Sequence, residues 1–136
     1  MSTQHPGFHG YERYERAKAH FAREEYAQVV QELEALFTDL AEARSEVGQS
    51  HVPGEDPVGH GTAEVHLLLA RAYFQTAQLR RAEAAAREVL REAPDDAYAH
   101  LLLGRTLQRA GRHDEARGPL RLAELLGGYG SGPSDP

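Results

Sequence analysis

An internal repeat of 34 residues is the feature that most constrains this chain. Residues 63–96 and 97–130 align without a gap, so that, for example, Arg71 corresponds to Arg105. A third, more divergent copy precedes them at about residues 10–43. A fixed period of about 20–50 residues is typical of arrays in which one small structural unit is repeated and stacked. The repeat therefore predicts an array of three such units.

Apolar and small residues within each copy follow the spacing of α-helices. Leu69 and Tyr73 are four residues apart, which places them on the same face of a helix. Small residues such as Ala82, Gly104 and Ala116 allow two antiparallel helices to approach closely. Each copy is therefore predicted to be a helical hairpin. One hairpin cannot bury its apolar face alone, so about three stacked hairpins are needed for a stable core.

The pattern of large, small and aromatic positions resembles the tetratricopeptide repeat (TPR) family. The residues that carry the resemblance are Leu69, Ala70, Tyr73, Ala82 and Pro94 in one copy, Leu103, Gly104, Gly111 and Ala116 in the next, and Ala17, Phe21, Tyr26, Leu33 and Leu36 in the first. His66 and His100 stand where the family motif has Trp. The resemblance implies an all-α fold, a short α-solenoid of three helical hairpins with six helices. It also implies a non-catalytic protein that binds other proteins.

The repeat divides the chain into six predicted stretches. They are a flexible N-terminus (1–9), a first hairpin with an extended second helix (10–47), an inserted flexible loop (48–62), a second hairpin (63–96), a third hairpin (97–126) and a disordered C-terminal tail (127–136). Pro and Gly in the loop, and Gly, Ser and Pro in the tail, favour irregular backbone. We expect helices at about residues 10–23, 26–47, 63–76, 79–93, 97–110 and 113–126.

Composition favours a soluble, intracellular protein. The chain has no Cys, so neither a disulfide nor thiolate chemistry is expected. No apolar run approaches the roughly 20 residues that span a bilayer, and residues 1–10 lack the pattern of a secretory signal. We therefore expect a cytoplasmic location and no membrane partner. Lys18 is the only Lys among 15 basic residues, a usage typical of GC-rich bacteria.

The net charge of −6 is concentrated in the first part of the chain. Residues 1–62 contain 11 acidic and 5 basic side chains, whereas residues 63–136 contain 10 of each. Such an acidic run is usually a solvated helix face, and an acidic docking surface is the alternative. Nucleic acid is not expected as a partner, because binding to phosphates requires clustered cations.

The sequence contains no catalytic motif, so we expect no enzyme and no cofactor. It has no phosphate-binding Gly-rich loop, no nucleophile motif and no paired His motif for zinc. His66 and His100 occupy equivalent positions of two copies, which favours a packing role for both. His51 and His60 share one loop with two acidic residues and are the candidates for a divalent ion. Because loops of this composition produce such clusters by chance, no metal site is predicted.

A basic residue recurs at one register position of every copy. These residues are Lys18, Arg71 and Arg105, and each lies beside an apolar or aromatic residue on the same helix face. The family resemblance implies that these faces line a concave groove, which suits a peptide that is acidic or ends in a free carboxylate. The predicted groove residues are Tyr14, Lys18, Phe21, Leu67, Arg71, Phe74, Leu101, Arg105, Gln108 and Arg109. The alternative is that these cations are inherited from the repeat and pair with neighbouring Glu.

The last predicted helix has a second apolar stripe, at Leu122 and Leu125, that no later helix covers. Its first stripe, which ends at Leu126, is expected to face its own hairpin partner. An uncapped end of a repeat array is poorly soluble unless a partner or a second copy covers it. The leading hypothesis is therefore a small adaptor that binds a peptide of another protein. The alternative is a structural scaffold that forms a homodimer through Leu122 and Leu125.

Overall fold

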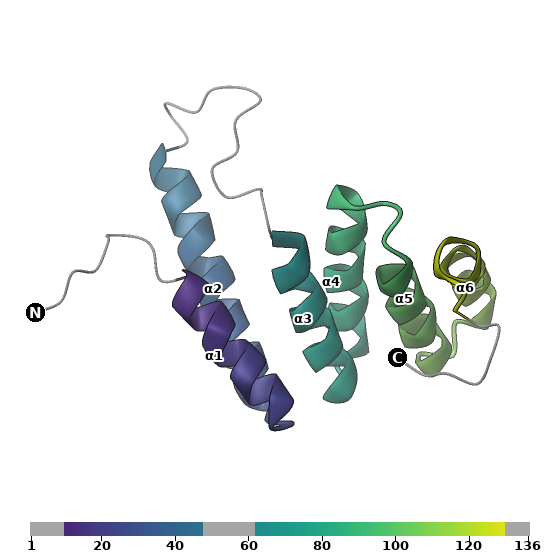
Figure 1. Ribbon diagram of the computed structural model, residues 1–136, viewed down its shortest axis with the longest axis horizontal. Helices are drawn as coiled ribbons and strands as arrows, with labels where there is room; N and C mark the ends of the chain where they lie inside the picture. Colours follow the sequence, from purple (N-terminus) through teal and green to yellow (C-terminus); the bar gives the residue numbers. More distant parts are fainter. Residues whose placement is uncertain (1–9, 48–61, 130–136) are drawn as a thin grey trace, which may run out of the picture. The chain divides into compact units, whose positions relative to one another are not determined.

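The computed structural model describes residues 10–47 and 62–129, and within these ranges every regular element is an α-helix (Figure 1). The helices are α1 (Gly10–Ala22), α2 (Tyr26–Val47), α3 (Thr62–Gln75), α4 (Leu79–Glu92), α5 (Ala97–Arg109) and α6 (His113–Gly127). The predicted all-α fold and its six helices are confirmed. The predictions for residues 1–9, 48–61 and 130–136 lie outside the described residues.

The described chain forms two compact units that divide between Thr62 and Ala63. The first unit contains α1 and α2, and the second contains α3, apart from its first residue, together with α4, α5 and α6. No helix of the described residues is long and apolar enough to cross a membrane.

The first unit is a hairpin whose two helices are joined by apolar packing and by ion pairs. Ala17 of α1 and Leu33 of α2 are fully buried. Arg13 of α1 bridges to two carboxylates of α2, with 3.4 Å from its Nη1 to Glu32 Oε1 and 3.3 Å from its Nε to Asp39 Oδ2. Removing a Leu side chain from water contributes about 1.5–3 kcal/mol, so the buried residues dominate the stability and the ion pairs orient the helices.

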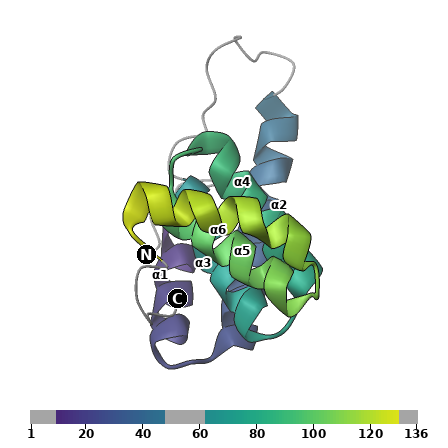
Figure 2. The ribbon, with the colours of Figure 1, turned by 90° about the vertical axis from the view of Figure 1, so that its right-hand side faces the viewer.

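The second unit places α3 to α6 one after another, and Figure 2 shows α6 crossing α5. Its core includes Val89, Leu102 and Leu107, all of which are fully buried. Gly104 is a point of close approach between α5 and α6, because a Cβ atom there would lie 2.5 Å from the Cγ atom of Leu120. A small residue at this position is therefore required by the packing, as its place in the repeat predicts.

The turn inside each hairpin has the same backbone geometry. Its central residue is Glu24, Ala77 or Gly111, and the three φ angles are 61°, 60° and 80°. In each turn the residue after it donates a backbone hydrogen bond to the carbonyl five residues earlier, with N···O distances of 2.9, 2.8 and 2.9 Å. This pattern is the Schellman motif, which ends a helix through a left-handed residue.

The end of α6 differs from the prediction. Leu126, which was expected to face α5, is 46% exposed. Gly127 meets α5 instead, because a Cβ atom at Gly127 would lie 2.6 Å from the Cβ atom of Ala97. The helix continues to Gly127, one residue beyond the predicted end, and left-handed Gly128 caps it with a hydrogen bond to the carbonyl of Glu124.

Candidate functional site

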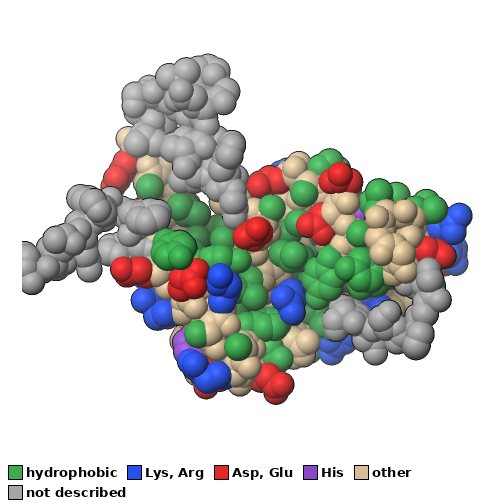
Figure 3. Space-filling model, viewed as in Figure 1, with side chains coloured by type: hydrophobic (Ala, Val, Ile, Leu, Met, Phe, Trp, Pro, Cys, Tyr) green, Lys and Arg blue, Asp and Glu red, His purple; other side chains and the backbone are tan. Residues whose placement is uncertain are grey.

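Helices α3 and α5 are connected on one face by two reciprocal contacts between an Arg and an aromatic ring. The guanidinium of Arg71 on α3 lies over the Tyr98 ring of α5, 5.7 Å from its centroid. The guanidinium of Arg109 on α5 lies over the Phe74 ring of α3, at 4.6 Å. Each helix thus contributes one cation and one ring. We name these four residues the α3–α5 face, and Figure 3 shows hydrophobic side chains gathered around individual cations on one side of the molecule.

These contacts hold the side chains of the α3–α5 face in defined positions. Arg109 also donates from Nη1 to the carbonyl of Phe74, with an N···O distance of 2.9 Å. Burial raises the pKa of Tyr98, and the neighbouring Arg71 guanidinium opposes this rise. A cation over a ring contributes about 0.5–1 kcal/mol at an exposed site. The face is therefore organised in the absence of any ligand.

The predicted residues of α1 lie in the first unit and form a cluster of similar chemistry. Lys18 Nζ lies 4.9 Å from the centroid of the Tyr14 ring. It also pairs with Glu15 at 3.2 Å, and the hydrogen bond to Glu15 raises the pKa of Lys18. Phe21 packs edge-on against Tyr26, with a centroid distance of 5.1 Å. This pairing with Glu15 is what we expect for Lys18 if the recurring cations are inherited from the repeat and pair with neighbouring Glu.

Three predicted residues of α5 line a pocket of about 570 Å³ against α6, which we name the α5–α6 pocket. They are Leu101, Arg105 and Gln108. The other lining residues, Arg117, Leu120, Arg121, Glu124 and Tyr129, were not among the predicted groove residues. Their contribution depends on how α6 crosses α5, which the repeat pattern of a single helix does not specify.

Two local features shape the α5–α6 pocket. The absence of a side chain at Gly104 lets Leu120 approach α5 next to Leu101, which is only 4% exposed. Beyond α6, left-handed Gly128 turns the backbone so that Tyr129 returns to α5. There the Tyr129 ring packs edge-on against Tyr98 at a centroid distance of 6.3 Å. The pocket therefore has an apolar floor and an aromatic wall.

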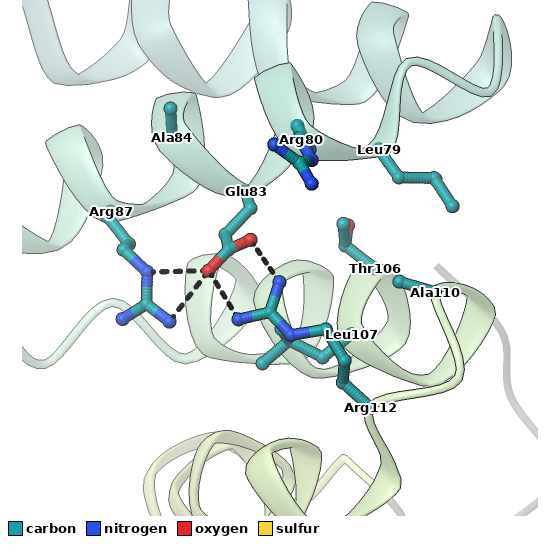
Figure 4. A pocket seen from close by; sticks show the side chains of 9 residues that line it. All are labelled: Leu79, Arg80, Glu83, Ala84, Arg87, Thr106, Leu107, Ala110 and Arg112. Atoms are coloured by element: carbon teal, nitrogen blue, oxygen red, sulfur yellow. Dashed lines mark hydrogen bonds and ion pairs between the residues drawn. The ribbon is translucent and has the colours of Figure 1, made fainter.

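A second pocket, of about 680 Å³, lies between α4 and α5 and contains a cluster of ion pairs (Figure 4). Glu83 of α4 lies at its centre and accepts hydrogen bonds from Arg87 at 3.0 Å and from Arg112 at 2.7 Å. Arg112 also donates to Glu115 of α6 at 2.7 Å. The cluster connects α4 to the start of α6, so we assign it a structural role.

The charges of this cluster depend on one another. The hydrogen bond from Arg112 lowers the pKa of Glu83, and the hydrogen bonds that Arg112 donates to Glu115 and Glu83 raise the pKa of Arg112. Sequence spacing reveals the contact between Glu83 and Arg87, because they are four residues apart on one helix. Arg112 lies 29 residues from Glu83, and no pattern in the sequence identifies that contact.

Exposed leucines form an apolar patch on α6. Leu122, Leu125 and Leu126 are 42%, 63% and 46% exposed. Leu125 and Leu126 follow Leu122 by three and four residues, so both lie on the same side of the helix as Leu122. We name these three residues the leucine patch.

His66 and His100 belong to no metal site among the residues that the structure describes. His100 is buried, and its Nε2 donates to the carbonyl of Pro94 at 2.8 Å, which is a packing role. Within residues 10–47 and 62–129 no three His, Cys, Asp or Glu side chains are grouped closely enough to hold a metal ion. The other candidates, His51 and His60, lie outside the described residues.

One comparison with known proteins, the scan against family models, agrees with the repeat pattern. Residues 67–136 match the family model of the tetratricopeptide repeat. Among solved structures, a Bacteroides ovatus protein for which protein binding is the suggested role matches with 14% sequence identity and a TM-score of 0.49. The alignment covers 88% of this chain and 57% of that protein, so the chain spans little more than half of its length. No curated protein matches the chain.

Proposed function

The chain belongs to the tetratricopeptide repeat family, and from this premise we propose that it is a non-catalytic adaptor that binds a peptide segment of another protein. The fold of this family generally serves protein–protein interaction and not catalysis, which supports a protein-interaction role. The finer proposal concerns the ligand. We propose a segment that is acidic or that ends in a free carboxylate, and no nucleic acid.

The observation that carries this proposal is the pair of reciprocal contacts on the α3–α5 face. A guanidinium that lies over a ring still has N–H donors at its edge, and a carboxylate can accept hydrogen bonds from them. Because Arg71 and Arg109 are held by Tyr98 and Phe74, little side-chain entropy is lost when a ligand binds. The rings offer apolar contact area beside each cation.

Charge distribution supports the same ligand. The protein as a whole is acidic, with a net charge of −6, so a face that presents Arg71 and Arg109 differs in sign from the average surface. A local field of this kind attracts acidic ligands and raises their association rate. We propose the same ligand chemistry for Tyr14, Lys18 and Phe21 of α1, as a separate cluster that its own variants test.

Selection from a library of random peptides tests the proposal. We expect the wild-type protein to enrich acidic peptides, and we expect Arg71→Glu combined with Arg109→Glu to lose this enrichment and to favour basic peptides. Arg91→Glu is the matched control, because Arg91 is exposed on α4 and pairs only with its helix neighbour Glu88 among the described contacts. Enrichment of the same acidic peptides by the double variant would refute the proposed ligand.

The leucine patch supports a second candidate function, a scaffold that forms a homodimer. Leu125 is 63% exposed and lies beside two further exposed leucines, an arrangement that marks interaction surfaces. One helix packed on its copy buries an area at the low end of stable interfaces, so we propose a weak dimer that dissociates on dilution. Light scattering over a range of concentrations would measure it, and Leu125→Asp should yield a monomer at every concentration.

A further inference from the structure

We propose that the pocket around Glu83 in Figure 4, which we name the α4–α5 pocket, binds the phosphate group of a phosphate monoester. The inference goes beyond the proposed peptide binding, because none of the residues that line this pocket belongs to the α3–α5 face. It gives contact roles to Arg80, Arg87 and Thr106. None of these three is among the site residues that the sequence predicts.

The α4–α5 pocket has an excess of positive charge. Arg80, Glu83 and Arg87 line it from α4, at spacings of three and four residues that place them on one face of the helix (Figure 4). Arg112 lines it from the start of α6 and also pairs with the carboxylate of Glu115. Even with Glu115 included, the three arginines outnumber the carboxylates. An anion that enters the pocket therefore meets an attractive local field.

The ion pairs of the pocket do not use all of its donors. Arg112 is occupied, because its Nη1 donates to Glu83 at 2.7 Å and its Nε donates to Glu115 at 3.0 Å. Arg87 donates to Glu83 from Nε and Nη2, which leaves its Nη1 without an acceptor in the described part of the chain. Arg80 makes no hydrogen bond or ion pair with any described residue. Arg80 and Arg87 can therefore donate to a ligand while the cluster around Glu83 stays intact.

Thr106 of α5 adds a buried hydroxyl to the pocket. It is 1% exposed and lines the pocket, and its Oγ1 has no hydrogen-bond partner among the residues that the structure describes. Buried polar groups in proteins are normally hydrogen-bonded. Rotation about the Cα–Cβ bond can turn the hydroxyl toward an oxygen atom of a ligand in the pocket. The hydroxyl of Thr106 thus gains a hydrogen bond when an oxyanion binds.

The N-terminal turn of α4 lies beside the same pocket, since Leu79 and Arg80, the first two residues of the helix, line it. Within the described chain, the side chain of the N-cap residue Gln78 makes no capping hydrogen bond. Backbone N–H groups in the first turn of a helix lack partners within the helix, and the helix dipole adds partial positive charge there. Such helix ends favour phosphate groups, and here the end acts together with the arginines and the Thr106 hydroxyl.

The arrangement of donors favours phosphate over a carboxylate. Arg80 and Arg87 belong to α4, whereas Thr106 belongs to α5, so the donors come from two helices. A phosphate monoester has three terminal oxygens around its phosphorus atom, and each donor can reach a different one. A carboxylate has two oxygens in one plane. The pocket volume of about 680 Å³ is within the range of sites for small organic molecules, and Leu79 and Ala84 offer apolar contact to the ester group.

Titration of the ¹⁵N-labelled full chain with methyl phosphate, followed by two-dimensional NMR, tests this inference. At about pH 7.5 a phosphate monoester is mostly a dianion, and the ionic strength is held constant with NaCl. We expect saturable shifts of the amide signals of Arg80 and Thr106, with a dissociation constant of about 1–10 mM for so small a ligand. Acetate should bind at least about tenfold more weakly. The absence of saturable shifts, or equal binding of acetate, would overturn the proposal.

Arg80→Gln is the decisive variant, because Arg80 is exposed and contributes nothing to the cluster around Glu83. We expect it to weaken binding of methyl phosphate at least about fivefold. Arg81→Gln is the matched control. It removes the same charge from the same turn of α4, but Arg81 does not line the pocket and donates to Gln78 instead. Equal effects of the two substitutions would attribute binding to the general field of the helix end and would overturn the assignment.

Thr106→Val tests the buried hydroxyl, since Val has nearly the same shape and no hydrogen-bonding group. We expect binding of methyl phosphate to weaken at least about threefold. The melting temperature without ligand should equal or exceed that of the wild type, because the substitution removes a buried hydroxyl that has no partner in the described structure. Unchanged binding by a folded Thr106→Val protein would overturn the contact role of Thr106.

Two further ligands distinguish the source of the phosphate group. Glycerol 3-phosphate is a small free ester, and N-acetyl-O-phosphoserine N-methylamide presents the same group on a protein side chain. Whichever binds more tightly identifies the source, and binding of both at least about tenfold more weakly than methyl phosphate would overturn the proposed room for an ester group. The peptide library tests the adaptor proposal separately, since Arg71 and Arg109 do not line this pocket.

Discussion

Arg109 contacts Phe74 twice, by covering its ring at 4.6 Å and by donating a hydrogen bond to its carbonyl at 2.9 Å. The carbonyl belongs to the last turn of α3, and it also accepts a hydrogen bond from the backbone N–H of Ala77 at 3.1 Å. Arg109 is on the following hairpin, 35 residues away. One side chain thus joins two consecutive hairpins and also positions a cation on the proposed binding face.

Replacing Arg109 with Met should lower the free energy of unfolding by about 1–2 kcal/mol, because the hydrogen bond and the contact with the ring are both lost. Urea denaturation followed by circular dichroism measures the change. Arg117→Met is the control, since Arg117 is 77% exposed and contacts only its helix neighbour Asp114 among the described residues. An equal effect of the two substitutions would contradict the linking role of Arg109.

Glu83 should make stability depend on pH. Its pKa is lowered in the folded protein, chiefly by the hydrogen bond from Arg112, so it binds its proton more weakly there than in the unfolded chain. The stabilising contribution is therefore present above the unfolded pKa, about 4.3, and is lost as the pH falls through the folded pKa. We expect Glu83→Gln to cost about 1 kcal/mol at pH 7, a value that allows for solvent screening, and to flatten the loss of stability below about pH 5.

Thermal melts of wild type and Glu83→Gln between pH 3 and 7 would measure this difference. Asp114→Asn serves as the control, because Asp114 pairs with Arg117 at the surface and is 87% exposed. Parallel pH profiles of wild type and Glu83→Gln would show that other carboxylates determine the acid sensitivity.

Two glycines of the second unit should respond differently to the same substitution. Gly104→Ala should cost about 1–3 kcal/mol, because the new Cβ atom would lie 2.5 Å from the side chain of Leu120. Gly118 of α6 has no atom within 4 Å of the corresponding position. There the higher helix propensity of Ala is opposed by the ring of Pro119, which follows it, so we expect a change near zero. A loss of similar size at both positions would contradict the close approach at Gly104.

Salt should separate the charged and apolar parts of the proposed binding face. Peptides selected by the wild-type protein should bind more weakly as salt rises, because screening shortens the reach of charges to about 8 Å at physiological ionic strength. Arg71→Glu with Arg105→Glu should reduce affinity at least about tenfold and remove most of the salt dependence. Phe74→Ala should weaken binding by a similar factor at every salt concentration, since an apolar contact is not screened. Fluorescence polarisation with labelled peptides measures both effects.

The leucine patch predicts a specific charge pattern if two copies of α6 pair about a two-fold axis. An axis close to residue 124, near the centre of the patch along the helix, places Arg121 within one helical turn of Glu124 of the second copy. Arg121→Glu and Glu124→Arg should then each prevent dimer formation, because each creates two like-charged contacts. An equimolar mixture of the two variants should form a heterodimer, in which both contacts are again between opposite charges.

The mixture isolates the contacts between the two chains. In each variant, positions 121 and 124 of the same helix carry like charges, so a heterodimer gains nothing from contacts within a chain. Sedimentation velocity of each variant alone and of the mixture would measure association. A mixture that remains monomeric, or variants that dimerise alone, would refute this pairing of α6.

Local and repeated features of the fold could be predicted from the sequence, whereas contacts between hairpins could not. The small residue at Gly104 predicts a close approach of helices, and the packing against Leu120 confirms it. Arg71 recurs at one register position, but its contact with Tyr98 depends on the offset between successive hairpins, which the period alone does not determine. The apolar spacing places Leu126 on the side of α6 that faces α5, and this prediction is wrong. Spacing within α6 does not reveal that Gly127 contacts α5 instead.

The recurring turn shows what the repetition has preserved. Gly111 adopts its left-handed backbone without steric cost, whereas Glu24 and Ala77 hold nearly the same φ angle at a cost of about 1–2 kcal/mol each. The backbone hydrogen bonds of the turn are the same in all three hairpins, so they compensate for an unsuitable residue. In evolutionary terms, duplication of the ancestral hairpin has kept a backbone geometry and has let the side chain at that position drift.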